Sequence, residues 1–208
     1  MLVATPGSGV AIVAHAAASG FGLAVGAGEG VASGGVRVVV LDPFEPSLGS
    51  VPPGATLVLR NPVVWVTALA RRGWVRDAED AARALQGWRT LARLWVALPV
   101  GVGDGLSPAC FDELRLEPIR LLEPLWRRWG LEPSPLALDR AIRYRERWYH
   151  RDLSRRTRWV RRDRPLSERR LRGASWGAVH ELLEEDWVAA LAARYEWPTE
   201  PRRYGVRG

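Results

Sequence analysis

Two stretches of the sequence carry residue types that could do chemistry: a glycine-rich turn near the first residues and an arginine-rich segment further along the chain. The turn, Thr5-Pro6-Gly7-Ser8-Gly9, lies between a short apolar run and an alanine-rich run. A glycine-rich turn that leads into a helix can hold a phosphate group, because its backbone N–H groups and the helix dipole attract anions. We therefore take Thr5, Gly7, Ser8 and Gly9 as a candidate phosphate-binding loop, and we assign no catalytic residue.

The arginine-rich segment, residues 140–172, holds 14 Arg and 4 acidic residues, whereas residues 1–139 hold 12 Arg and 13 acids. Most of its charges have no acidic residue nearby in sequence, so the segment requires an anionic partner. Guanidinium groups bind phosphate in bidentate fashion, and aromatic rings can stack on bases. We expect nucleic acid, bound through its backbone, with an acidic protein or a second copy of the chain as alternatives and anionic lipid as the least favoured. The candidate contacts are Arg151, Arg155, Arg156, Arg158, Arg161, Arg162, Arg164, Arg169, Arg170, Arg172, Trp148 and Trp159.

The aromatic residues of this segment also fit a helix core. Ile142, Trp148 or Tyr149, Leu153 and Val160 could form an apolar stripe on a helix whose other faces carry Arg. The acidic residues that follow could fold back on the arginines or meet those of a second copy; they are Glu181, Glu184, Glu185 and Asp186. An apolar stripe suited to such packing accompanies them: Trp176, Val179, Leu183, Trp187 and Leu191.

Alternating strands and helices must position these two stretches. Short apolar or β-branched runs predict strands at residues 2–4, 36–41, 55–59 and 94–98, and each of the last three ends close to a proline. Uninterrupted apolar strands of this kind are typical of a parallel sheet covered on both faces. The glycine-rich residues 20–35 are predicted to be a loop.

Helical periodicity fills the remaining chain. We predict helices at residues 10–19, 77–93, 111–129, 136–160 and 167–197, with Asp77 as the cap of the second. The fold class is therefore α/β, a parallel sheet with flanking helices followed by a helical C-terminal region. We place an α/β domain at residues 1–135, an arginine-rich helical region at 136–197 and a loose tail at 198–208.

At the glycine turn the chain resembles a family. Pro6-Gly7-Ser8-Gly9, followed by the strand Val36–Leu41 and Asp42-Pro43, is similar to the compact P-loop ATPases of viral genome packaging and filamentous-phage assembly, the Zot-like branch of the FtsK and HerA superfamily. The resemblance covers about residues 1–135 and implies a P-loop-like fold and a phage or mobile-element setting.

The resemblance also implies which catalytic groups are missing. Val10 stands where the family has its phosphate-binding lysine, and Ala11 stands where it has the hydroxyl that holds Mg²⁺. Arg60 and Asn61 follow the strand that would carry the acidic pair, and Leu98 and Pro99 stand near the place of a glutamine. Loss of these groups removes the charges that stabilise phosphoryl transfer, so we expect a degenerate, non-catalytic relative.

The composition excludes further classes of site. All 30 basic residues are Arg, so no lysine can form a Schiff base or serve as a general base. The lone Cys110 allows no disulfide within the chain, and His15, His150 and His180 are too widely spaced to suggest a metal site. A cluster of Asp42, Asp104, Asp112 and Glu113 in a metal-dependent nuclease, or a packaging-type ATPase, remains the enzyme alternative.

The remaining expectations concern setting and partners. The uncharged residues 10–28 are interrupted by four glycines and contain His15, so we disfavour a membrane span. We expect a cytoplasmic or virion-associated protein with no cofactor, apart from weak nucleotide binding at the glycine turn. With only one Asn and one Gln, the composition suggests a thermophilic source.

Overall fold

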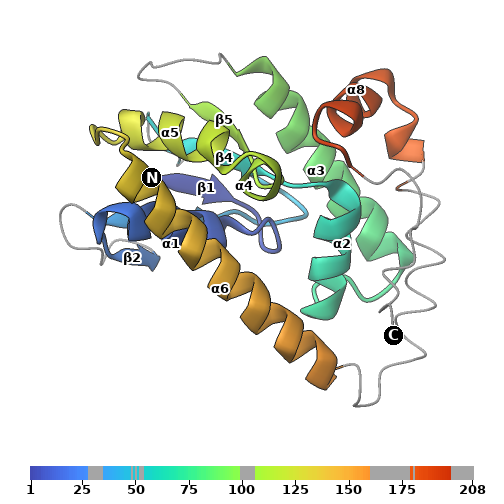
Figure 1. Ribbon diagram of the computed structural model, residues 1–208. Coiled ribbons are helices and arrows are strands. Elements are labelled where there is room, and N and C mark those ends of the chain that lie inside the picture. The colour runs from blue at the N-terminus through green and yellow to red at the C-terminus, as the bar shows by residue number, and fades with distance from the viewer. Residues whose placement is uncertain are drawn as a thin grey trace.

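A parallel five-stranded sheet forms the centre of the described molecule (Figure 1). The computed structural model describes residues 1–27, 35–47, 49, 51, 54–98, 106–159, 179 and 181–197. The strand order is β2-β3-β1-β4-β5, and every neighbouring pair runs parallel. The strands are β1 (Leu2–Ala4), β2 (Val25–Ala27), β3 (Val36–Val40), β4 (Thr56–Leu59) and β5 (Ser107–Cys110).

Alternate side chains of the strands enter two separate cores. Leu2 and Ala4 of β1 pack on one face of the sheet, while Val3, between them, packs on the other. Leu57 and Val58 of β4 divide in the same way. This alternation follows from the two-residue repeat of a strand, and it explains why these strands are apolar on both sides.

One face of the sheet is covered by α1 (Val10–Phe21), α5 (Pro118–Arg128) and the first half of α6 (Pro135–Trp159). The three meet where small residues allow close approach: a Cβ atom on Gly20 of α1 would lie 3.0 Å from the ring of Trp126 and 3.0 Å from the carbonyl of Ala137. The short helix α4 (Glu113–Leu116) lies beside α5. Trp126 Nε1 donates to the Ala17 carbonyl at 2.9 Å, which fixes α5 on α1.

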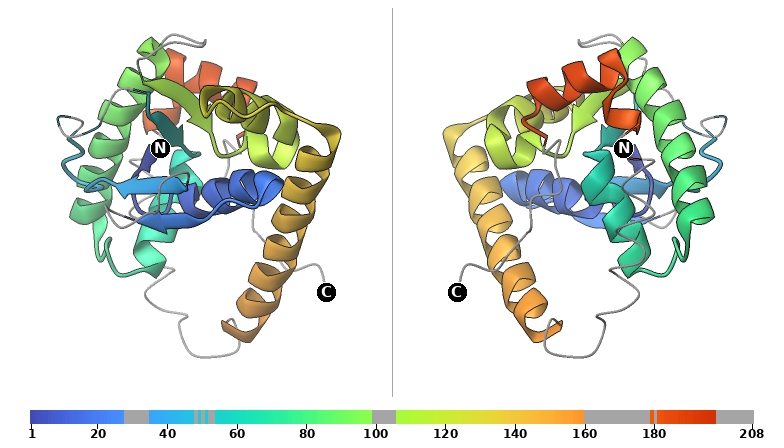
Figure 2. Two further views of the ribbon diagram at one scale, coloured as in Figure 1. Left: turned by 90° about the vertical axis from the view of Figure 1, so that its left-hand side faces the viewer. Right: turned by 90° about the vertical axis from the view of Figure 1, so that its right-hand side faces the viewer.

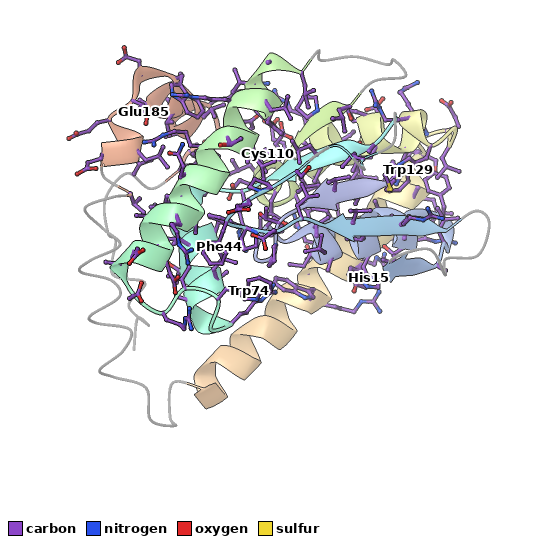
Figure 3. All side chains as sticks on the ribbon, turned by 180° about the vertical axis from the view of Figure 1, so that it is seen from behind. His15, Phe44, Trp74, Cys110, Trp129 and Glu185 are labelled. Carbon is purple, nitrogen blue, oxygen red and sulfur yellow. The ribbon has the colours of Figure 1, made fainter. Side chains whose placement is uncertain are left out.

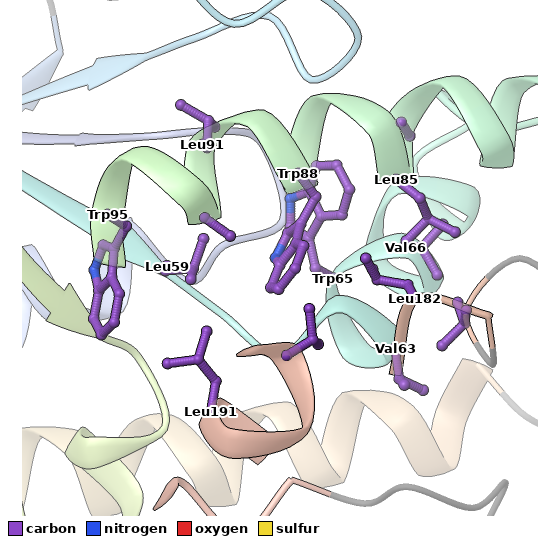
Figure 4. Packing of buried hydrophobic residues seen from close by; sticks show 14 of the residues in the cluster. Leu59, Val63, Trp65, Val66, Leu85, Trp88, Leu91, Trp95, Leu182 and Leu191 are labelled. Atoms are coloured by element: carbon purple, nitrogen blue, oxygen red, sulfur yellow. The ribbon is translucent and has the colours of Figure 1, made fainter. Parts of the chain in front are cut away.

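The opposite face is covered by α2 (Pro62–Arg71), α3 (Ala78–Ala97) and the described C-terminal residues, 179 and 181–197, which include α8 (Asp186–Arg194). Trp65, Trp88 and Trp95 fill this core together with leucines from all three segments (Figure 4). Trp88 stacks with Trp187 and meets Trp197 edge to face, so the C-terminal segment completes the cover over α3.

Most of the predicted elements are confirmed. Strands β1, β3 and β4 and helices α1, α3 and α6 lie close to the predicted bounds, and Asp77 caps α3 by accepting from the Asp80 N–H at 2.8 Å. The predicted helix at 111–129 is interrupted at Glu117-Pro118, because the residue before a proline avoids helical geometry. Of the helix predicted at 167–197, residues 167–178 and 180 lie outside the described residues.

The prediction of a strand at Leu94–Leu98 was wrong, because these residues form the last turn of α3. The buried positions Leu91, Ala92 and Trp95 continue the helical spacing of the preceding turns, while Leu94 and Val96 are exposed. A five-residue apolar run cannot distinguish a strand from a helix end. The implied correspondence of Leu98 and Pro99 to a strand-borne glutamine is therefore also wrong.

Two strands lie where none was predicted. β5 contains Pro108, which an edge strand tolerates because the proline nitrogen can face away from the neighbouring strand. On either side of Pro108, the Ser107 N–H donates to the Ala55 carbonyl and the Phe111 N–H to the Leu59 carbonyl. β2, the opposite edge, occupies Val25–Ala27 within the stretch predicted to be a loop. No helix among the described residues is long and apolar enough to cross a bilayer.

Candidate functional site

The glycine turn lies at the carboxyl end of the sheet, where the chain leaves neighbouring strands for opposite faces. After β1 the chain enters α1 on one face, and after β4 it enters α2 on the other. In open parallel sheets, ligands bind at such a divergence. The loops that meet there are Thr5–Gly9, Arg60–Asn61 and Phe111–Asp112.

The glycine turn is compact and runs directly into the first turn of α1. Gly7 and Gly9 have φ values of +83° and +82°, which residues with a side chain rarely adopt. The Ser8 N–H donates to the Thr5 carbonyl at 3.2 Å, and the Gly9 carbonyl accepts from Ile12 and Val13. Thr5 and Ser8 are buried. The loop therefore has the form of a helix N-terminal turn, with its polar side chains turned inward.

Arg60 and Phe111 close this loop from the side of β4 and β5. Arg60 Nη1 donates to the Gly7 carbonyl at 2.8 Å, and its guanidinium carbon lies 4.4 Å from the centroid of the Phe111 ring. The same ring covers Gly9 so closely that a Cβ atom there would lie 2.4 Å from it. A cation thus fills the space beside the loop where the family resemblance would place an acidic residue, and this arrangement disfavours a metal ion.

Two buried donors at the start of α2 lack a described partner. Asn61 accepts from the Val63 and Val64 N–H groups through Oδ1 and so caps α2, while its Nδ2 has no partner among the described residues. Trp65 Nε1 also lacks a described acceptor, and the adjoining Cδ1 lies 3.5 Å from the Cβ position of Gly7. Buried donors of this kind usually have a water or an anion as partner. Of the two, the Trp65 indole adjoins Gly7, so its N–H could hold an anion beside Thr5, Gly7, Ser8 and Gly9.

Asp112 is bound by hydrogen bonds from three parts of the chain. Its Oδ2 accepts from the Asn61 N–H at 3.1 Å, from the Cys110 thiol at 3.7 Å and from Trp197 Nε1 at 2.9 Å. Burial raises the pKa of the Cys110 thiol and that of the neighbouring Glu113 carboxyl. Cys110 faces the interior of the molecule (Figure 3). Asp112 therefore joins β4, β5 and the C-terminal segment.

The carboxylates considered for a nuclease site do not form a metal cluster in the described structure. Asp42 accepts from the Phe44 and Glu45 N–H groups and stabilises a turn after β3. Among the described residues no three potential metal ligands lie together, and Asp104 lies outside them. No described geometry thus favours a two-metal reaction.

No family model matches the chain, and no curated protein matches it.

The remaining candidate site is the arginine-rich segment, whose first part is a regular helix. α6 carries Arg151, Arg155, Arg156, Arg158 and Trp159 near its C-terminal end, in a part whose side chains are not described. Six further candidates lie outside the described residues: Arg161, Arg162, Arg164, Arg169, Arg170 and Arg172.

α6 is held to the body by small and aromatic residues. Ala137 and Ala141 are buried against α1, and Tyr144 and Trp148 pack against the same core. Tyr144 stacks with His15 of α1 at 5.8 Å between ring centroids. Trp148 is thus half-buried and packs against the body, as the interpretation of these aromatic residues as part of a helix core predicted. The apolar stripe predicted through Ile142 is not the face that contacts α1. The observed contact face runs through Ala141, about a third of a helical turn from Ile142.

Of the α6 arginines whose side chains are described, one anchors the helix to the body and three are exposed. Arg145 donates to the Leu114 carbonyl at 3.0 Å and so ties α6 to α4. Arg140, Arg143 and Arg147 are exposed, and Arg143 pairs with Asp139 at 2.9 Å. The exposed arginines therefore stand on a helix whose position is fixed.

The acidic C-terminal residues have a partner that the sequence did not indicate. Glu185 pairs with Arg89 at 2.5 Å and lies 3.8 Å from Arg93, both on α3. Burial acts to raise the pKa of Glu185, but hydrogen bonds from Trp187 and Arg89 outweigh it and hold that pKa below its usual value. The arginines of α3 are thus one described target of this acidic run. The contacts Arg60–Gly7 and Trp197–Asp112 were also missed, and no local sequence signal would have revealed them.

Proposed function

We propose that this protein binds nucleic acid without catalysing a reaction, and that it contacts the phosphate backbone through the arginine-rich residues 140–172. The observation that carries the proposal is the construction of α6. One face of this helix is anchored to α1 and α4, while Arg140, Arg143 and Arg147 remain exposed and the helix continues into a region with four more arginines. An anchored row of guanidinium groups is suited to phosphates at regular spacing.

The glycine turn supports the non-enzymatic part of the proposal. Arg60 and Phe111 occupy its open side, and the chain supplies neither the lysine nor the acidic pair that phosphoryl transfer requires. Together with the resemblance to packaging and assembly ATPases, these features favour a pseudo-ATPase of a phage or mobile element, acting in the cytoplasm or within a virion. An anion at Trp65 would be a structural ligand in this setting.

The experiment is a salt titration of DNA binding by fluorescence anisotropy. If about five phosphates are contacted, the logarithm of the affinity falls by about 4.5 for each tenfold rise in salt. The variant Arg140→Gln/Arg147→Gln should make this slope shallower by about 2, because two phosphate contacts are lost.

The matched control is Arg120→Gln/Arg127→Gln, which removes the same charge from exposed positions on α5. These arginines pair with Glu117 and Glu123 and lie on a different helix from the proposed contacts. The control should leave the slope unchanged. An affinity that does not respond to salt, or an equal loss in the two variants, would rule out the proposed binding surface.

A further inference from the structure

The position of α6 relative to α1 sets how much of the helix extends beyond the body. The two helices are antiparallel: the Gly20 position lies against Ala137, Ser19 Oγ donates to the Arg140 carbonyl at 3.5 Å, and His15 stacks on Tyr144. Continuing this register brings Trp148 to the first turn of α1, which begins at Val10. The contact between the two helices therefore ends near Trp148.

The remainder of α6 runs past the end of α1 (Figure 2). Residues 149–159 continue as regular helix for about 16 Å, at 1.5 Å per residue. No other described helix or strand runs beside this part in either view. We call it the projecting end of α6.

The arginine positions of α6 form a single line along the helix. Positions 140, 143, 147, 151, 155 and 158 are spaced by three or four residues and average 3.6, the repeat of an α-helix. Each therefore lies within about 60° of Arg140 around the axis. The acidic positions 139, 146 and 152 lie about 100–120° from Arg140 around the axis, outside the line but at its margins, where Asp139 pairs with Arg143. The line extends from the anchored half of α6 onto the projecting end.

These features distinguish between forms of nucleic acid. A helix with its side chains is about 10–12 Å across, which matches the major groove of B-form DNA, about 12 Å wide. The major groove of an RNA duplex is too deep and narrow to admit it. Binding of single strands usually depends on exposed aromatic platforms, whereas the aromatic residues of α6 whose side chains are described, Tyr144 and Trp148, pack against the body.

We propose that the projecting end of α6 enters the major groove of duplex DNA, with the arginine line directed to the phosphates and base edges of the groove. This inference rests on the proposed function and adds the form of the nucleic acid and the mode of contact. The partner is B-form DNA rather than a single strand or an RNA duplex.

The first test compares one 20-base-pair sequence as DNA duplex, RNA duplex and single-stranded DNA at equal salt, with the full chain. We expect the DNA duplex to bind at least about tenfold more tightly than either of the others, since contacts with the groove are available only there. Methyl green, which occupies the major groove, should compete, and distamycin, which occupies the minor groove, should not. Equal or tighter binding of the single strand or the RNA duplex overturns the inference.

The second test breaks the projecting helix without changing any charge. Ser154→Pro interrupts α6 beyond its contacts with α1, and Ser154→Ala is the control that preserves the helix. We expect Ser154→Pro to weaken binding of the DNA duplex about tenfold or more, and Ser154→Ala to bind like the wild type. Thermal unfolding of both variants verifies that the body remains folded.

The outcomes separate the two proposals. If Ser154→Pro binds the DNA duplex like the wild type, with the same steep salt response, the groove-binding inference is wrong and binding through the backbone stands. If no nucleic acid binds in a salt-dependent manner, the proposed function itself fails. The comparison of DNA with RNA uses the unaltered protein and so does not depend on the folding of any variant.

Discussion

Replacing Gly9 with alanine tests whether Phe111 closes the glycine turn. The new Cβ atom would lie 2.4 Å from the Phe111 ring, at a residue whose φ is +82°. The left-handed backbone costs about 1–2 kcal/mol for a residue with a side chain, and overpacking against the ring costs about 1–3 kcal/mol. Gly9→Ala should therefore lower the free energy of unfolding by about 2–5 kcal/mol.

Gly22, at the other end of the same helix, separates these two contributions. Its φ is +69°, and nothing lies within 4 Å of its Cβ position. Gly22→Ala should therefore cost only the backbone contribution, about 1–2 kcal/mol. Removing the ring with Phe111→Ala should reduce the further cost of Gly9→Ala to about that of Gly22→Ala.

The assay is urea denaturation monitored by circular dichroism, in one buffer that contains a stabilising osmolyte. It compares Gly9→Ala, Phe111→Ala, the double variant and Gly22→Ala. The coupling free energy between positions 9 and 111 should be about 1–3 kcal/mol. If Gly9→Ala costs as much without the ring as with it, Phe111 does not close the loop and the explanation is refuted.

Two further predictions concern the C-terminal segment. Trp197→Phe removes the donor to Asp112 and should destabilise the protein by about 1–3 kcal/mol in urea denaturation, since the acceptor is a partly buried carboxylate; no change would show that this hydrogen bond does not anchor the segment. The pKa of Glu185 is lowered in the folded protein. Its contribution to the free energy of unfolding is therefore present at pH values above its ordinary pKa, near 4.5, and is lost as the pH falls through the folded pKa. The difference in unfolding free energy between wild type and Glu185→Gln should thus shrink from pH 6 to pH 3, and a difference that grows on acidification would contradict the ion pair with Arg89.

The elements with strong local signals could be predicted from the sequence. The β-branched run of β3 and the capped, periodic helix α3 are examples, because the strand repeat and the Asp77 cap act within a few residues. The end of α3 and the edge strand β5 could not. Whether Leu94–Leu98 continues a helix depends on the contacts of Trp95 with β5, whose carbonyl at Ala109 accepts from its Nε1.

The candidate site was located by sequence but not characterised by it. The turn Thr5–Gly9 was predicted to precede a helix, and it does. Its closure depends on Arg60 and Phe111, which follow β4 and β5, the first and second strands from β1 in the order of the sheet. Such contacts follow from topology, and a single sequence does not reveal which side chains fill a space between distant segments.

The division of the core between two faces has a consequence for synthesis of the chain. The cover over Trp88 and Trp95 includes residues 179 and 181–197, which leave the ribosome about 70 residues after β5. At 5–20 residues per second, aromatic surface on α3 lacks this cover for roughly 3–15 seconds, whereas the α1 face needs only α5 and the start of α6. A chain truncated before residue 179 would keep that surface exposed, so nascent or incomplete chains should be the species that aggregate or recruit chaperones.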